Sequence, residues 1–307
     1  MNKIPPYLKP GDTIGIAAPA RKISRAELAP TLALLERRGY KVVLPDNLFA
    51  ECHQFAGTDG QRAADMQSLL DNPEVKAIFF ARGGYGSVRI IDQLDFTAFL
   101  QAPKWLCGYS DMTVFHSHLQ ANYQIPTLHA TMPVNITDET ADSDNVRTLF
   151  EALEGRQLTY EVTAHPFNRS GSATAPVVGG NLSMLYSLLG SPSDIDTDGK
   201  ILFIEDLDEY LYHIDRMMMN LKRNGKLERL AGLVIGGMSD MNDNTIPYGK
   251  TAEEIVAEHC AGYDYPVCFG FPAGHIARNL TLKLGMTAQL KVTDKQTVLS
   301  FLLQDSV

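Results

Sequence analysis

The stretch "KWLCGYSDMTVFHSHL", residues 104–119, decides the fold of the N-terminal half of this 307-residue chain. Apolar residues 105–107 are typical of a buried strand, and a helical pattern begins at residue 111. A strand that leads directly into a helix is the repeating joint of α/β proteins. Ser110 lies at this joint, either as a helix cap or as an exposed nucleophile.

The same alternation extends outward from this joint. Strands are predicted at 13–20, 40–46, 75–81, 104–109 and 125–130, and helices at 24–40, 60–72, 87–94, 95–102 and 111–123. Strands that alternate with helices predict an α/β fold with a parallel sheet covered by helices on both faces. In the first helix Ser24 and Glu27 form a capping box, while Pro30 predicts a kink or a later start.

The composition of the sequence changes after the first α/β unit. Residues 156–176 are polar, rich in Gly, Ser and Pro, and lack a helical period, so we interpret them as a linker or crossover. This places one domain at 1–155 and another at 177–307. The second domain is predicted to contain helices at 179–191, 208–227 and 251–263, strands at 200–206, 230–238 and 266–275, and antiparallel strands within 280–302.

Composition excludes several classes of protein. The net charge of −9 is unfavourable for non-specific nucleic-acid binding, which needs a basic surface. No apolar run has the length of a signal peptide or a membrane span, so we expect no membrane partner. The four cysteines are widely spaced without a CxxC pair, as in reduced thiols of a cytoplasmic protein.

Ser110 has two interpretations from its position alone. A serine between a strand and a helix exposes its hydroxyl, and the helix start offers backbone N–H groups to a developing oxyanion. The arrangement resembles a nucleophile elbow, although Met112 replaces the second glycine of GxSxG. Alternatively, Ser110 or Asp111 is an N-cap. A nucleophile would need a base and an acid that orients the base.

The sequence "ARGGYG", residues 81–86, follows the third predicted strand. Its glycines could supply an oxyanion N–H beside Ser110, or they could form only a tight turn. Nucleotide binding is the weaker interpretation, because neither GxGxxG nor a Gly-Lys-Ser/Thr sequence is present.

Candidate acids and bases also follow strands. "FIEDLDE", residues 203–209, places Glu205 and Asp206 where they could orient a histidine, although acidic residues there are often solvated or cap a helix. His275 lies in a Gly-containing loop within "GFPAGHIARN", residues 270–279, which favours a functional position.

Two other chemistries are less favoured by the pattern. His116 and His118 are two residues apart and do not share a helix face, so a zinc site with His129 is an unfavoured alternative. Cys107 lies inside an apolar strand, where a core role is favoured over a nucleophilic one.

Five motifs together resemble one known family. They are "ARGGYG" at 81–86, "GYSD" at 108–111, "GGNL" at 179–182, "FIED" at 203–206 and "PAGH" at 272–275. Their order is similar to that of the LD-carboxypeptidases, which are serine peptidases that act on muramoyl tetrapeptides. The resemblance covers essentially the whole chain, although "LHATM" at 128–132 and Lys283 depart from the usual pattern.

The resemblance implies a catalytic triad of Ser110, Glu205 and His275, with an oxyanion hole from the N–H groups of Gly84 and Asp111. It implies a three-layer N-terminal α/β domain, a smaller C-terminal α/β domain and an active site in the cleft between them. It also implies a cytoplasmic homodimer that needs no metal or other cofactor.

The implied substrate is a murein stem tetrapeptide from cell-wall recycling, cut between the L-centre of a diamino acid and a terminal D-alanine. An exopeptidase must recognise the free carboxylate. Arg82 is our candidate clamp, because a guanidinium holds a carboxylate bidentately, and Gly83 is a candidate substrate contact. Arg82 could equally be a structural ion-pair partner.

Two alternative functions remain. A related branch of the family cleaves peptide–nucleotide antibiotic conjugates and confers self-immunity, commonly with an aromatic stacking group in an added loop. A two-lobed periplasmic-type binding protein is the non-enzyme alternative. The missing signal peptide and the Ser–Glu–His set count against it.

Overall fold

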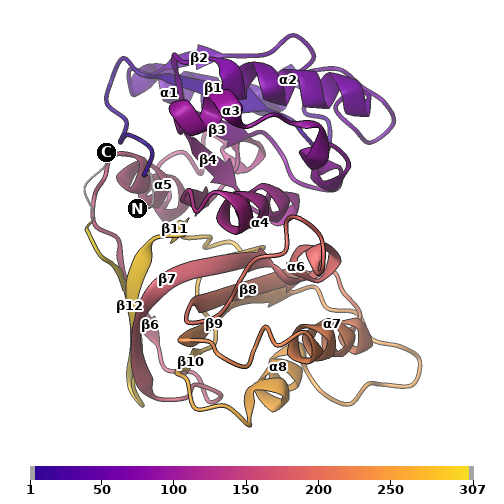
Figure 1. Cartoon of the computed structure of the whole chain (residues 1–307). Helices are drawn as coiled ribbons and strands as arrows, with labels where there is room; N and C mark the ends of the chain where they lie inside the picture. Colours follow the sequence, from indigo (N-terminus) through magenta and orange to yellow (C-terminus); the bar gives the residue numbers. More distant parts are fainter. Residues whose placement is uncertain (1–3, 304–307) are drawn as a thin grey trace.

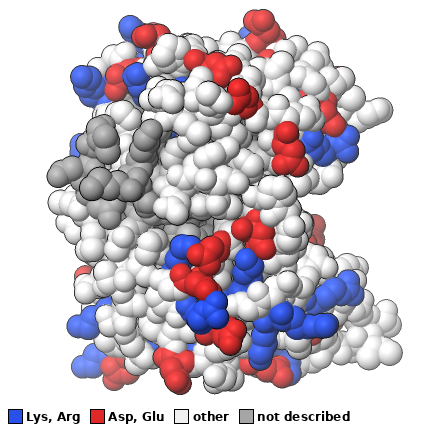
Figure 2. All heavy atoms as spheres, in the orientation of Figure 1, with Lys and Arg blue, Asp and Glu red and all other residues white. Residues whose placement is uncertain are grey.

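The computed structural model describes residues 4–303 and contains two α/β halves, stacked one above the other in Figure 1. The outer ends of the two predicted domains, residues 1–3 and 304–307, lie outside this range. No helix in the described range is both long enough and apolar enough to cross a membrane. Lys and Arg side chains intermingle with Asp and Glu on the face shown in Figure 2.

The first half is built on a six-stranded sheet. In order across the sheet, its strands are β11 (Leu282–Leu284), β5 (Thr127–His129), β4 (Trp105–Gly108), β3 (Val75–Phe80), β1 (Thr13–Ala17) and β2 (Lys41–Val43). The five strands predicted from the sequence are parallel, as expected. The sheet is nevertheless mixed, because β11 comes from the C-terminal half and runs antiparallel to β5.

Helices cover both faces of this sheet and make three layers. They are α1 (Arg25–Arg37), α2 (Asp59–Asp71), α3 (Thr97–Gln101), α4 (Thr113–Asn122) and α5 (Asp144–Leu153), with short 3₁₀ turns η1 (Ser87–Arg89), η2 (Ile91–Gln93), η3 (Ser110–Met112) and η4 (Pro133–Asn135). Phe79 packs into the core beneath α1 and α5, whereas Phe80 packs into the core beneath α2 and α4. Successive strand residues face opposite layers, which explains why the strands are apolar throughout.

The second half contains a seven-stranded mixed sheet. Its strands, in order, are β10 (Val267–Cys268), β9 (Gly232–Ser239), β8 (Ile201–Leu207), β7 (Gly171–Asn181), β12 (Thr287–Val292), β13 (Gln296–Phe301) and β6 (Thr159–Thr163). Its helices are α6 (Leu182–Leu188), α7 (Leu211–Arg223) and α8 (Ala252–Cys260).

Strand β7 joins the two parts of this sheet. Residues 171–176 pair antiparallel with β12, and residues 177–181 pair parallel with β8. Pro176, which has no N–H for a ladder, lies where the strand changes partner. Residues 156–176, interpreted from the sequence as a linker or crossover, contain β6 and the first half of β7.

The two halves are joined by direct contacts near the carboxyl ends of their strands. The Thr113 hydroxyl at the start of α4 accepts the Asn181 N–H at 2.9 Å. Asn145 at the start of α5 accepts the Asn279 N–H at 2.8 Å. These contacts place the Ser110 turn of the first half opposite the loops that follow β8 and β10 in the second.

Candidate active site

Ser110 lies in a strained turn. Strand β4 ends at Gly108, and Ser110 has a φ of +68°, a left-handed conformation that costs a non-glycine residue on the order of 1–3 kcal/mol. No side chain caps η3, whose N-cap is Tyr109, or α4, whose N-cap is Met112. The interpretation of Ser110 or Asp111 as an N-cap is therefore wrong, and Ser110 itself is half-buried.

The glycine turn after β3 lies directly against this serine. A Cβ added to Gly83 would come within 2.9 Å of Ser110 Cβ and 3.0 Å of Ser110 Oγ, so only glycine fits without displacement. Gly84 has a φ of +108°. Within the described part of the chain, the N–H groups of Gly84 and Asp111 donate to no other group, so both are available to a ligand.

Glu205 and His275 form a tight pair on the facing half. Glu205 is completely buried near the end of β8, and its Oε2 lies 2.6 Å from His275 Nδ1. The same oxygen accepts the His275 backbone N–H at 3.1 Å. Because a carboxylate can only accept, His275 carries its proton on Nδ1, and its Nε2 is left able to accept a proton.

The loop that carries His275 is fixed from several sides. Ser239 Oγ donates to the His275 carbonyl at 2.7 Å, and the Gly274 N–H donates to Asn279 Oδ1 at 2.9 Å. A Cβ added to Gly274 would lie 2.6 Å from Glu205 Oε2, so glycine permits the close approach of the acid. Neither Ser239 nor Asn279 was singled out from the sequence, because no motif there marks either side chain as a partner of the His275 loop.

Tyr109 brings the two sides together. Its ring centroid lies 4.7 Å from that of His275, so the residue before Ser110 packs on the His275 ring. Among the described residues, no hydrogen bond joins Ser110 to His275. Such bonds are often long in ligand-free enzymes and shorten when substrate binds.

This geometry agrees with comparisons to known proteins. Residues 14–130 match the model of the LD-carboxypeptidase N-terminal domain, and residues 174–290 match that of the C-terminal domain. A probable murein peptide carboxypeptidase from Bacillus subtilis is 34% identical over 97% of this chain and 95% of that protein. The chain belongs to the LD-carboxypeptidase family. It is therefore a member of a family of serine-type peptidases.

Other members are similar along nearly their whole length. A murein tetrapeptide carboxypeptidase from Pseudomonas aeruginosa is 26% identical, over 91% of this chain and 92% of that protein. The crystal structure of muramoyltetrapeptide carboxypeptidase from Oxalobacter formigenes superposes with a TM-score of 0.86 at 27% identity, covering 94% of this chain and 98% of that one. The microcin self-immunity protein MccF from Escherichia coli is 27% identical, over 93% and 92% of the two chains.

In this LD-carboxypeptidase family member, the two neighbouring acids differ in their contacts. Glu205 contacts His275, whereas Asp206 accepts hydrogen bonds from Asn181 Nδ2 at 2.9 Å and the Ser183 N–H at 2.8 Å. Burial, followed by the charge of Glu205, raises the pKa of Asp206 to about 7. The contacts thus separate an acid that orients the histidine from one that holds the start of α6.

Arg82 of this peptidase lies beside the glycine turn but already has a partner. Its Nη1 donates to Glu27 Oε1 at 2.9 Å, and its side chain is 32% exposed. Glu27 also accepts from Ser24 in the predicted capping box at the start of α1. The structural ion pair foreseen as an alternative is therefore present, and only part of the guanidinium is engaged.

The remaining candidate groups have separate environments in this peptidase. His116 Nε2 bonds to the Gly108 carbonyl and His118 to Ser193 Oγ, and no three His, Cys, Asp or Glu in the described range are placed to share a metal ion. Cys107 is buried, and burial raises the pKa of its thiol well above the usual value, which confirms the core role.

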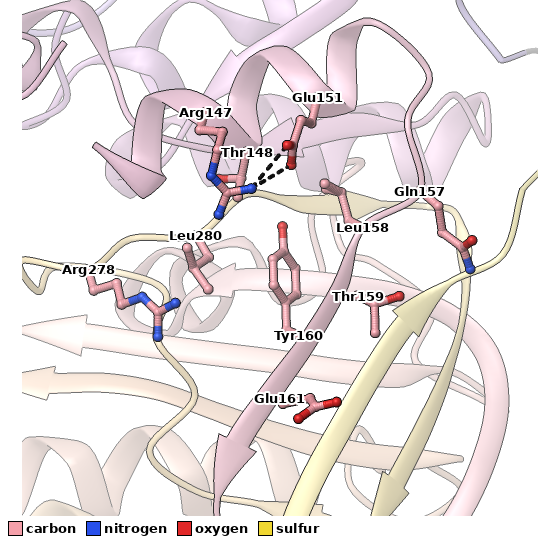
Figure 3. Close-up of a pocket in the computed structure, with 10 residues that line it drawn as sticks. All are labelled: Arg147, Thr148, Glu151, Gln157, Leu158, Thr159, Tyr160, Glu161, Arg278 and Leu280. Atoms are coloured by element: carbon pink, nitrogen blue, oxygen red, sulfur yellow. Dashed lines mark hydrogen bonds and ion pairs between the residues drawn. The ribbon is translucent and has the colours of Figure 1, made fainter. Parts of the chain in front are cut away.

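A cavity of about 360 Å³ lies between α5, β6 and the loop after His275. Figure 3 shows Arg147 paired with Glu151 at its upper side and Arg278 at its edge. None of the proposed triad lines this cavity, so it is separate from the reacting groups.

Proposed function

We propose that this chain hydrolyses the peptide bond between the L-centre of a diamino acid and the terminal D-alanine of murein tetrapeptides. The observation that carries the proposal is the Glu205–His275 pair facing a strained Ser110, in a chain similar to named murein peptide carboxypeptidases. Cell-wall recycling would be the process that supplies this substrate.

In the proposed mechanism His275 Nε2 removes the proton of Ser110 Oγ, while Glu205 holds the Nδ1–H tautomer. Oγ attacks the carbonyl carbon, and the resulting oxyanion accepts from the free N–H groups of Gly84 and Asp111. The imidazolium then gives its proton to the D-alanine amine as the peptide bond breaks. Water, deprotonated by His275, releases the acyl group and restores Ser110.

The free carboxylate of the substrate needs a cation near this turn. We propose that Arg82 binds this carboxylate. It is two residues before Gly84, the proposed oxyanion donor, with only Gly83 between them. The Nη2 and Nε atoms of Arg82 have no acceptor among the described residues. A guanidinium that keeps one structural ion pair can still offer its other donors to a carboxylate. Gly83, which contacts Ser110, is the proposed backbone contact.

The self-immunity activity named for MccF is the second candidate. An aromatic group at the cleft would favour it, but the one tryptophan of this chain, Trp105, is completely buried and donates to the Pro6 carbonyl. Trp105 therefore has no face free to stack on a nucleobase, although Tyr85 of the glycine turn and Tyr210 after β8 are each 44% exposed. The carboxypeptidase activity is favoured by the similarity to named murein peptide carboxypeptidases.

The deciding experiment is release of D-alanine from a disaccharide or free tetrapeptide by wild type and Ser110→Ala. We expect release by wild type and a loss of at least about 10⁴-fold in a folded variant. Unchanged release by the variant would remove Ser110 from the mechanism. No release by wild type, with cleavage of an aminoacyl sulfamoyl nucleoside, would replace the carboxypeptidase by the self-immunity activity.

A further inference from the structure

The side chain of Asp111 lies at the centre of the nucleophile turn, yet it has no role in the mechanism above. It is 1% exposed. Its Oδ2 accepts the Ser87 N–H at 2.8 Å, and its Oδ1 has no partner among the described residues. Burial raises the pKa of this carboxyl, while the Ser87 hydroxyl, the Ser87 and Gly86 N–H groups and the Arg62 charge act in the opposite direction. Because burying a carboxylate is costly, this set of contacts with residues 86 and 87 needs a reason.

The contact joins the two segments that carry the proposed oxyanion donors. Ser87 immediately follows the glycine turn that contains Gly84, while Asp111 itself supplies the other N–H. The two segments are otherwise distant in the chain, on different strands of the sheet. The hydrogen bond from Ser87 to Asp111 therefore ties together the two segments that carry these N–H groups.

The far side of the glycine turn is also held. The buried Arg62 guanidinium donates to the Gly86 carbonyl at 3.0 Å and to the Pro19 carbonyl. Gly86 has a φ of +151°, and a Cβ there would lie 2.6 Å from Arg62 Nη1. The turn is thus fixed between Arg62 on one side and Asp111 on the other, and cannot adjust freely if one contact is lost.

We propose that the Asp111 carboxylate is a positioning residue that sets the spacing between the Gly84 and Asp111 amides through its hydrogen bond to Ser87. The proposal rests on the proposed function for the identity of the two oxyanion donors. According to this proposal, the rate depends on the length of the Asp111 side chain and on its acceptor oxygen, and depends less on its charge. Loss of one well-placed oxyanion donor costs about 10²- to 10³-fold in rate, so misplacement should cost a comparable factor.

The test compares Asp111→Asn with Asp111→Glu. Asparagine keeps the distance and an acceptor oxygen for the Ser87 N–H but loses the charge. Glutamate keeps the charge but adds a methylene that pushes the turn away. We expect kcat for D-alanine release to stay within about 10-fold of wild type in Asp111→Asn and to fall about 10²-fold in Asp111→Glu, with KM changed little in both.

The second readout does not depend on the natural substrate. A fluorophosphonate phosphonylates an activated serine: Oγ bonds to phosphorus, fluoride leaves, and the hydroxyl proton passes to the base. The phosphoryl oxygen of the probe occupies the oxyanion hole. The labelling rate, followed by intact mass, should therefore be close to wild type in Asp111→Asn and lower in Asp111→Glu. If wild type is labelled but releases no D-alanine, the proposed function is overturned. The role of Asp111 is then tested by the labelling rates of the variants alone.

Asp65 offers a matched control, because it is another buried carboxylate that accepts a backbone N–H, that of Asn47 at 3.1 Å. Asp65→Asn and Asp65→Glu should change thermal stability but leave kcat and labelling unchanged. Equal labelling of Asp111→Glu and wild type would overturn the proposal. So would an Asp111→Asn variant that is folded but as slow as Asp111→Glu, or a wild type in which Ser110 is not labelled.

Discussion

The two sides of the candidate site are built by different means. On the first half, Ser110 is placed by backbone conformation, through its φ of +68° and the contact with Gly83. On the second half, His275 is placed by two hydrogen bonds, one that it donates to Glu205 and one that its carbonyl accepts from Ser239. The difference teaches that a small added group should damage the first side most, whereas loss of a single polar atom should damage the second.

Replacement of Glu205 by glutamine tests the hydrogen bonds that position His275, and we expect it to have the largest effect on kcat. Glutamine is nearly the same size, but its amide no longer fixes the Nδ1–H tautomer of His275, so we expect kcat to fall by at least about 10³-fold. The measurement is steady-state release of D-alanine. Glu258, an exposed acid paired with Lys250, provides the control Glu258→Gln, which should retain full activity. Equal rates for the two variants would contradict the hydrogen-bonded design of this side.

A single methyl group tests the backbone side. Gly83→Ala places a Cβ against Ser110, and we expect it to lower kcat about 10²-fold by moving the nucleophile out of line. Gly60→Ala is the control, because a Cβ at Gly60 in α2 meets no atom within 4 Å. If Gly83→Ala keeps full activity, the close contact seen beside Ser110 has no role in placing it.

Replacement of Arg82 by lysine tests the binding of the substrate carboxylate without changing the positions of Ser110 and His275. Lysine keeps a charge but loses the fork geometry that suits a carboxylate, so we expect KM to rise about 10-fold with kcat nearly unchanged. Glu27→Gln is the companion variant. It removes the structural partner of Arg82 and should lower KM or leave it the same. A KM that is unaffected in Arg82→Lys would leave Arg82 as an ion-pair residue alone.

The smallest expected effect concerns Asp206 and the pH dependence of stability. Its folded-state pKa of about 7 lies above the ordinary aspartate value of about 4, so the folded protein binds this proton more tightly than the unfolded chain. Its stabilising contribution is therefore present below about pH 4 and is lost as the pH rises to about 7. Urea unfolding across this range should show a flatter profile in Asp206→Asn than in wild type.

Residues close in the chain were enough to predict the five parallel strands of the first half and its helices α1 to α4. The helix predicted at 87–94 is wrong, because this stretch forms the 3₁₀ turns η1 and η2, and α5 was not predicted. The Ser24–Glu27 capping box is confirmed, because its residues are local. The predicted later start at Pro30 is wrong, since α1 begins at Arg25 and includes the proline. The capping box fixes the helix start and outweighs the missing N–H of Pro30.

Features that depend on distant contacts were not predictable in the same way. Strand β7 contains Gly179, Gly180 and Pro176, which disfavour strands, and it forms because β8 and β12 pair with its two halves. The sequence also left Glu205 and Asp206 unresolved except through the family resemblance. Their roles are separated only by contacts with residues far along the chain, His275 and Asn181.

Strand β11 has a consequence for how the protein is made. Residues 282–284 complete the first sheet by pairing with β5, the strand beside the one that leads to Ser110. During synthesis β11 leaves the ribosome long after β5, so the first sheet keeps an open edge while most of the second half is being made. Such an edge is exposed to wrong pairing, and contacts between distant segments form slowly. A peptidase assembled in this order completes its first sheet only after most of its second half has been made.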